Sequence, residues 1–166
     1  NGCQAYPHVF NLVRNTNKGK EEKDHFKAIY GTELTLIDDT VKIVLRPTDA
    51  DLLKSTYVVF DLETTGFNAG GEDSIIEIGA VKILNGEIID RYDQLVDPGK
   101  EISERITNVT NITNEMLVGK PNEETAIKEF KEWIADLPMV AHNAKFDVSF
   151  VEMAYEKYNL GEFKNT

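Results

Sequence analysis

The sequence has few of the features that mark a secreted or membrane-bound protein. Cys3 is the only cysteine, so no disulfide can form within the chain, and no run of about eighteen apolar residues could cross a bilayer. The first residues lack the basic region and apolar stretch of a signal peptide. We therefore expect a cytoplasmic protein, with reduced thiols and no membrane partner.

The chain also lacks an excess of positive charge. Its formal net charge is −11; residues 1–56 hold eight acidic and eight basic side chains, whereas residues 57–166 hold 21 acidic and 10 basic. This balance argues against a general nucleic-acid-binding protein, which is usually basic. It agrees with an enzyme whose carboxylates hold divalent cations, because the metal then supplies the positive charge that faces a phosphate.

The change in charge near residue 56 is the clearest sign of a domain boundary, because there is no internal repeat and no low-complexity tract. Before it, a helix near 7–18 and a β-hairpin within 28–45 are expected. The expected division is a small segment at 1–46, a polar linker at 47–56 and a main domain at 57–166.

Strands and helices mix in the predicted main domain. Asn85-Gly86 favours a two-residue hairpin turn, and Asn122 is placed to cap a helix that Pro138 ends. A mixed sheet flanked by helices, an α/β domain, is therefore predicted. The predicted order is strand 57–63, strands 74–84 and 87–96, helix 122–137, strand 139–141, and a helix from about 144.

Asp61 and Glu63 are the first candidate site residues. Side chains alternate along a strand, so both carboxylates project from one face near its end. Two like charges at the end of an apolar strand repel each other unless a cation bridges them or one stays protonated. Oxygen ligands of this kind suit Mg²⁺ or Mn²⁺. The alternative interpretation is a pair of exposed acids beside a loop.

The turn that follows, Thr64-Thr65-Gly66, offers hydroxyl and backbone N–H groups to a sugar-phosphate end, and glycine permits close approach. An ordinary hydroxyl-rich turn is the alternative. Glu77 lies within the second strand, on the face predicted to carry Ile75, and needs a polar partner there. A substrate sugar and an internal backbone hydrogen bond are equally acceptable partners.

Asp147 and His142 are the remaining candidates. The short strand at 139–141 is expected beside the strand of Asp61, which would bring Asp147 toward the first two acids as a third metal ligand. Asp147 also suits the first turn of a helix for electrostatic reasons alone. His142 is a candidate general base, although a loop histidine is more often structural.

Three segments in this order resemble the first motifs of the DnaQ-like exonucleases, which have an RNase H-like fold and use four acids and a histidine. The segments are Val59-Phe-Asp-Leu-Glu-Thr-Thr-Gly, Ile75-Ile-Glu-Ile-Gly-Ala-Val and Ala141-His-Asn-Ala-Lys-Phe-Asp. The resemblance implies that Asp61, Glu63 and Asp147 hold two metal ions. It implies substrate contacts from Thr64, Thr65, Gly66, Phe67, His142, Asn143 and Phe146, and we add Glu77 to these.

The N-terminal flank and one segment inside the main domain resemble PolC-type DNA polymerase III, in which the exonuclease is inserted in a PHP (polymerase and histidinol phosphatase) domain. Cys3-Gln-Ala-Tyr-Pro, Ile29-Tyr-Gly-Thr-Glu and Ile112–Leu117 carry this resemblance. Glu33 matches a PHP metal ligand, but its histidine partners are not in the chain. The family's last motif, a histidine followed by an aspartate, has no match after Asp147, and the last sheet strand is also expected to be missing.

The resemblance implies a 3′→5′ proofreading exonuclease that hydrolyses the terminal phosphodiester of DNA with two metal ions. The 3′ end of DNA and the rest of the polymerase and replisome are the implied partners. One alternative is a ribonuclease of the same superfamily. Another is that this chain by itself is a catalytically incomplete structural or interaction segment. An incomplete sheet would leave an exposed edge, which favours self-association.

Overall fold

The computed structural model describes residues 6–29, 44 and 46–166. The chain divides into two compact units, Asn1–Val41 and Lys42–Thr166. Among the helices in these described ranges, none combines the length and hydropathy of a membrane-spanning helix. Most of the predicted 28–45 hairpin and Glu33 lie outside the described residues, so the assignment of the first segment to a PHP domain stays a prediction.

The first unit contains the helix α1 (Tyr6–Asn17) and a short 3-10 helix η1 (Glu22–Asp24). None of the residues of α1 is buried. Asn17 joins the helix end to the chain after η1, because its amide donates to the carbonyl of Phe26 and accepts from the Phe26 N–H, both at 2.7 Å.

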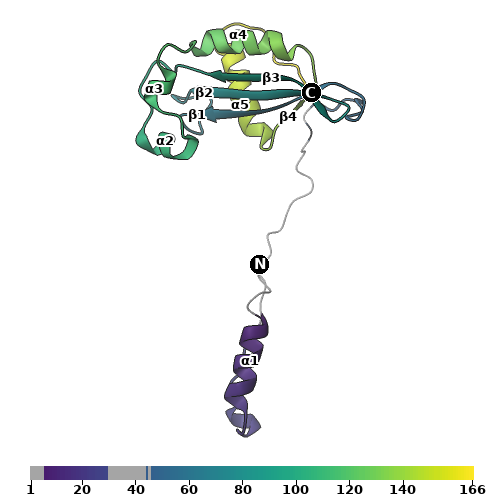
Figure 1. Cartoon of the computed structure of the whole chain (residues 1–166), viewed down its shortest axis with the longest axis vertical. Helices are drawn as coiled ribbons and strands as arrows, with labels where there is room; N and C mark the ends of the chain where they lie inside the picture. The colour runs from purple at the N-terminus through teal and green to yellow at the C-terminus, as the bar shows by residue number, and fades with distance from the viewer. Residues whose placement is uncertain (1–5, 30–43, 45) are drawn as a thin grey trace. The chain divides into compact units, whose positions relative to one another are not determined.

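The second unit is built on a four-stranded sheet with the order β3-β2-β1-β4 (Figure 1). Pairing is antiparallel between β1 and β2 and between β2 and β3, whereas β4 lies parallel to β1. The predicted mixed α/β architecture is confirmed. The strands are β1 (Tyr57–Thr64), β2 (Ile75–Leu84), β3 (Glu87–Leu95) and β4 (Met139–Val140).

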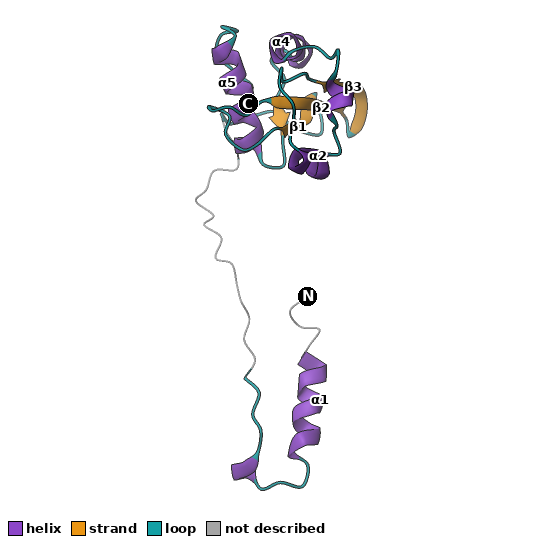
Figure 2. Ribbon diagram, turned by 90° about the vertical axis from the view of Figure 1, so that its left-hand side faces the viewer, coloured by secondary structure: helices purple, strands orange, loops and turns teal. Residues whose placement is uncertain are grey.

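Four helices accompany this sheet: α2 (Glu104–Thr110), α3 (Asn114–Leu117), α4 (Glu123–Ile134) and α5 (Ala144–Lys157). Figure 2 shows α4 and α2 on different sides of the strands. The side chain of Asn122 accepts from the Thr125 N–H at 2.9 Å, which confirms the predicted helix cap. The helix ends at Ile134, earlier than predicted, because Ala135 turns to a positive φ of 49°.

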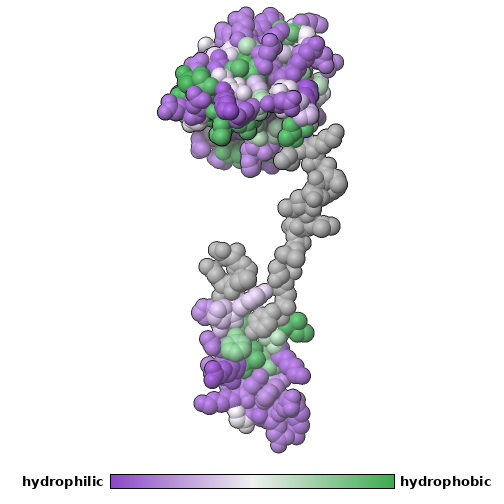
Figure 3. Space-filling view, turned by 90° about the vertical axis from the view of Figure 1, so that its right-hand side faces the viewer, coloured by the Kyte–Doolittle hydropathy of each residue, from purple (hydrophilic) through white to green (hydrophobic). Residues whose placement is uncertain are grey.

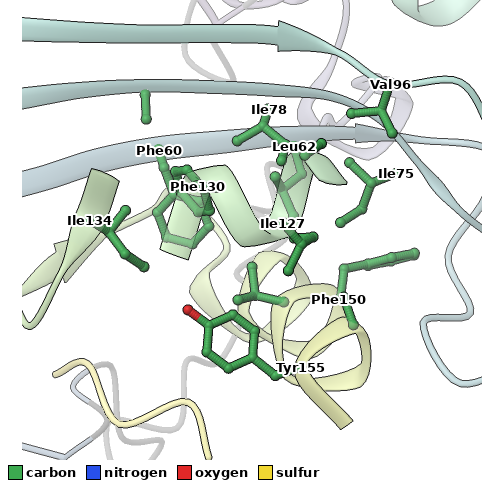
Figure 4. Close-up of a cluster of buried hydrophobic side chains, with 14 of the residues drawn as sticks. Phe60, Leu62, Ile75, Ile78, Val96, Ile127, Phe130, Ile134, Phe150 and Tyr155 are labelled. Carbon is green, nitrogen blue, oxygen red and sulfur yellow. The ribbon is translucent and has the colours of Figure 1, made fainter. Parts of the chain in front are cut away.

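The main core lies between the sheet and the helices α4 and α5. Alternate residues of β1 point into it, namely Val58, Phe60 and Leu62, and Phe130 of α4 is fully buried against them. Figure 4 shows how side chains from the sheet, α4 and α5 meet in this cluster. Figure 3 shows a largely hydrophilic outer surface of this unit with small hydrophobic patches.

An irregularity in the β1–β2 pairing changes the direction of one predicted side chain. The register shifts between Glu63 and Thr64, so that Thr64 lies opposite Ile75. Ile75 consequently packs in the main core with Ile78, and the prediction that it shares the face of Glu77 is wrong. Ile76 instead packs in a second cluster with residues next to and within α2 and α3.

The sheet has two edges, β3 and β4. The outer side of β4 meets the C-terminal residues, because the Met139 N–H donates to the carbonyl of Thr166 at 2.6 Å. The edge strand β3 carries mostly exposed residues, including the charged Glu87, Asp90 and Arg91. Charges on an edge oppose strand pairing between molecules. Self-association through a sheet edge stays a prediction.

Candidate active site

The strand β1 holds the first two candidate acids on the face opposite the core. Leu62, between them in the sequence, is buried, whereas Asp61 is exposed and Glu63 half-buried. This alternation confirms that the two carboxylates share a face. Their position near the end of β1 brings them to the turn that begins at Thr64.

Glu77 is the neighbour of Glu63 across the antiparallel pair. Burial, and then the charges of Asp61, Glu77 and Asp147, raise the pKa of Glu63. Burial also raises the pKa of Glu77, with further contributions from Asp93 and Asp61. The predicted acids therefore influence one another electrostatically. The three that lie on strands, Asp61, Glu63 and Glu77, point away from the apolar core.

Asp147 reaches this site from the first turn of α5. It is only 2% exposed, and its Oδ1 accepts a hydrogen bond from the Leu62 N–H at 3.2 Å. Burial raises the pKa of the Asp147 carboxyl, and the charge of Asp61 raises it further, while the Leu62 N–H and His142 act in the opposite direction. The third carboxylate thus lies against the backbone between the first two.

The short length of β4 explains how the Leu62 N–H becomes available. The Val58 N–H donates to the carbonyl of Pro138 at 2.8 Å, so the even-numbered N–H groups of β1 point toward β4. Pairing between the two strands covers only Val58 and Val59 of β1. Beyond that point no strand among the described residues pairs with the Leu62 N–H, and the carboxylate of Asp147 accepts from it instead.

The four carboxylates form no ion pair in the described part of the chain. None of the ion pairs there involves Asp61, Glu63, Glu77 or Asp147. Such a set of acids suits a hard divalent cation, which would offset their repulsion. Among the described residues, no group of three or more His, Cys, Asp or Glu side chains is already arranged to hold an ion.

The turn after β1 is held in place by Asp73. Its two carboxylate oxygens accept from the Thr65 hydroxyl at 3.3 Å and from the Asn68 N–H at 3.0 Å. A Cβ on Gly66 would lie 2.4 Å from the same carboxylate, so no larger residue fits without displacing it. Gly66 therefore allows the close approach of the turn to Asp73.

A cavity of about 350 Å³ adjoins this turn. Phe67 is 86% exposed at its rim, with its ring centroid 6.0 Å from that of Phe146. Exposed aromatic rings beside a cavity suit stacking against a nucleobase. Of the predicted residues, the cavity is lined by Glu63, Thr64, Thr65, Gly66, Phe67 and Phe146.

The other predicted residues lie outside the cavity wall. Asp61, Glu77 and Asp147 form the acidic site next to it, on β1, β2 and α5. His142 and Asn143 are exposed on the loop between β4 and α5, where Asn143 precedes the helix without a side-chain capping bond. This loop leads directly into α5, whose first turn carries Asp147.

Sequence reasoning missed the contribution of α2 to the cavity. Its lining includes Ser103, Arg105, Ile106, Val109 and Thr110, from α2 and the residue before it. The sequence signal that could have revealed α2 is the helix cap Ser103, whose hydroxyl accepts from the Ile106 N–H at 3.4 Å. Ile106 and Val109 are three residues apart, the spacing of one helix face.

Comparison with known proteins defines the class of protein to which this fold and these acids belong. Residues 58–165 match a family described as Exonuclease. The chain belongs to this exonuclease family, whose matched region covers the four strands of the sheet apart from Tyr57 and includes all the candidate site residues.

The particular relatives are polymerases. The chain is 48% identical to the DNA polymerase III PolC-type of Staphylococcus haemolyticus over 99% of its own length and 11% of the relative. It is 48% identical to that of Staphylococcus aureus over 87% of its length and 10% of the relative. The chain thus spans about a tenth of the length of these curated relatives, and its similarity to them extends into the first unit.

Solved structures of exonuclease I share the fold. The product-bound enzyme superposes with a TM-score of 0.56 at 17% identity, over 63% of this chain and 26% of the other. The Escherichia coli enzyme in complex with a dT13 oligonucleotide gives a TM-score of 0.56 at 17% identity, over 63% and 24%. The RNase H-like exonuclease architecture expected from the sequence is confirmed.

Proposed function

We propose that this chain is the 3′→5′ proofreading exonuclease portion of a PolC-type DNA polymerase III, and that it hydrolyses the terminal phosphodiester of DNA. The observation that carries the proposal is the hydrogen bond from the Leu62 N–H to Asp147 in a chain of the exonuclease family. This bond assembles the acids of two distant motifs beside a cavity of about 350 Å³. Its partners would be the rest of the polymerase and the replisome, in the cytoplasm.

Asp61, Glu63 and Asp147 are the residues that would hold Mg²⁺ or Mn²⁺, two ions in the complete site. When bound, such ions lower the pKa of an attacking water and stabilise the charge on the leaving 3′ oxygen. The chain's own residues do the positioning. The Thr64–Gly66 turn, held by Asp73, would receive the sugar-phosphate end, while Phe67 and Phe146 would stack against the terminal base.

Fraying would explain the preference for mismatched ends. A mispaired 3′ terminus unpairs at a lower free-energy cost than a paired one, so it enters the cavity as a single strand more often. Glu77 would then contact the terminal sugar, and His142 and Asn143 would contact the substrate from the loop before α5. His142 is also a candidate to accept the proton of the attacking water.

The test is release of mononucleotides from a 3′-mispaired primer–template with Mg²⁺ or Mn²⁺. It compares this chain, and a form extended by the following segment of its parent protein, with the corresponding Asp61→Ala variants. We expect metal-dependent hydrolysis that Asp61→Ala abolishes, and slower hydrolysis of a matched RNA end. Equal cleavage of RNA would favour a ribonuclease. No cleavage by either form with any metal would leave a binding or structural role.

Cation binding should stabilise the fold in a pH-dependent way. Because the folded pKa values of Glu63, Glu77 and Asp147 are raised, their contribution to stability without cation is lost as pH rises through those values. Mn²⁺ at tenfold its Kd should restore about 1.4 kcal/mol, or roughly 5 °C in Tm, at neutral pH. Below the raised pKa values protons displace the ion, and the increase in Tm should vanish.

The rise in Tm is measured by thermal unfolding monitored by fluorescence, with and without Mn²⁺, from acidic pH below the raised pKa values to neutral pH. Asp61→Asn is the matched control, since it removes the one exposed charge of the Asp61–Glu63 pair and keeps the shape of the side chain. This variant should have a higher Tm than the wild type in the absence of metal. The rise in its Tm on adding Mn²⁺ should be smaller than that of the wild type. An equal increment at acidic and neutral pH, or in the variant, would contradict binding at these carboxylates.

A further inference from the structure

The helix α2 contributes to the cavity side chains that no sequence motif singled out. The turn Thr64–Phe67 and Phe146 line one part of the cavity, and α2 with Ser103 lines the other. From α2 come Ile106 and Val109, which are apolar, and Arg105, which is basic. Val109 is 73% exposed, so the cavity opens toward solvent along this helix.

Arg105 has the charge that a nucleic acid needs at this place. Among the described residues that line the cavity, it is the only base, and Glu63 is the only acid. Its side chain is exposed, and none of the ion pairs or hydrogen bonds between described residues engages it. The net negative charge of the chain repels a polyanion such as DNA. An unpaired guanidinium attracts the polyanion locally in spite of this repulsion.

We propose that Arg105 binds an internal phosphate of the DNA strand, on the 5′ side of the bond that is cut. This inference rests on the proposed function. A strand whose terminal phosphodiester lies at Asp61 and Glu63 must carry its next phosphate along the cavity, away from the acids. Arg105 meets it there, and its planar fork of N–H donors suits two phosphate oxygens. Ile106 and Val109 contact the intervening sugar and base.

The experiment measures binding of a short 5′-fluorescein-labelled oligodeoxythymidine to this chain by anisotropy, in Ca²⁺ and over a range of KCl concentrations. Loss of one phosphate contact on a single strand makes the slope of log K against log salt less negative by about 0.7. Arg105→Ala should show this change and bind about tenfold more weakly at low salt. Arg105→Lys should keep most of the slope, because the charge remains.

Lys128→Ala is the matched control. It also removes one positive charge, but Lys128 lies on α4, paired with Glu124 at 2.6 Å and away from the cavity. Its salt slope should equal that of the wild type. Because Arg105 is exposed, circular-dichroism melting should give the same Tm for both variants and the wild type.

The outcomes separate the two proposals. If Arg105→Ala has the slope and affinity of Lys128→Ala, while the wild type binds DNA and Asp61→Ala abolishes hydrolysis, the assignment of Arg105 is wrong and the nuclease function stands. If the wild type neither binds nor cuts the single strand with any divalent cation, the nuclease function itself fails, and the role of Arg105 fails with it.

Discussion

Asp147→Asn is expected to reduce hydrolysis by about 100-fold or more while leaving the fold as stable as the wild type. The loss follows from removing one of three carboxylates that would hold the metal ions, since stabilisation of several kcal/mol corresponds to at least two powers of ten in rate. The fold survives because the asparagine oxygen can still accept from the Leu62 N–H, which Asp147 engages at 3.2 Å. Removing a buried charge also removes its desolvation cost.

Asp147→Ala distinguishes the two roles of this side chain. Alanine should lose the same activity but also leave the Leu62 N–H without an acceptor, at a cost of about 1–3 kcal/mol. Mononucleotide release and urea unfolding of both variants measure the effects. Activity retained by the asparagine variant would show that the carboxylate does not hold metal, and equal stability of the two variants would contradict the structural role of the hydrogen bond.

Phe130→Ala should have the largest effect on stability. Phe130 is fully buried, and its ring lies 5.4 Å from that of Tyr92 and 6.1 Å from that of Phe60, which ties α4 to the sheet. Truncation of a buried phenylalanine costs about 3–5 kcal/mol, through lost transfer free energy and the cavity left behind. Since domains are typically stable by only about 5–15 kcal/mol, the variant should be partly unfolded at moderate temperature.

Phe67→Ala is the matched control, because it removes the same side chain from an exposed position. Its free energy of unfolding should change by less than about 1 kcal/mol. Instead, the KM for a single-stranded 3′ end should rise about tenfold, as expected for the loss of one base-stacking contact. Urea unfolding and initial rates measure both. A Phe67→Ala variant as unstable as Phe130→Ala would show that the exposed ring has a structural role.

Local rules predicted much of the site correctly. Strand alternation placed Asp61 and Glu63 on one face, and Asn85-Gly86 forms the hairpin turn with φ values of 53° and 78°. The cap at Asn122 was also predicted, because its partner lies only three residues away. Each of these features depends on neighbours in the sequence, so the residues alone were enough to predict them.

What could not be predicted depends on long-range packing. The register shift that turns Ile75 into the core arises from the pairing of β2 with β1, and the wall formed by α2 depends on the second cluster around Ile76. Burial of a residue is a property of the assembled sheet and helices. No periodicity within one segment indicates which distant segment will cover it.

The sequence by itself determined the α/β class, the shared face of the first two acids and the exonuclease family, because these follow from alternation, turn chemistry and motif order. Only the tertiary structure decided how Asp147, already expected near these acids, is held beside them, and that Arg105 lines the same cavity. The physical reason is the shortness of β4: it leaves the Leu62 N–H of β1 unpaired, and a carboxylate 85 residues away in the sequence becomes its partner.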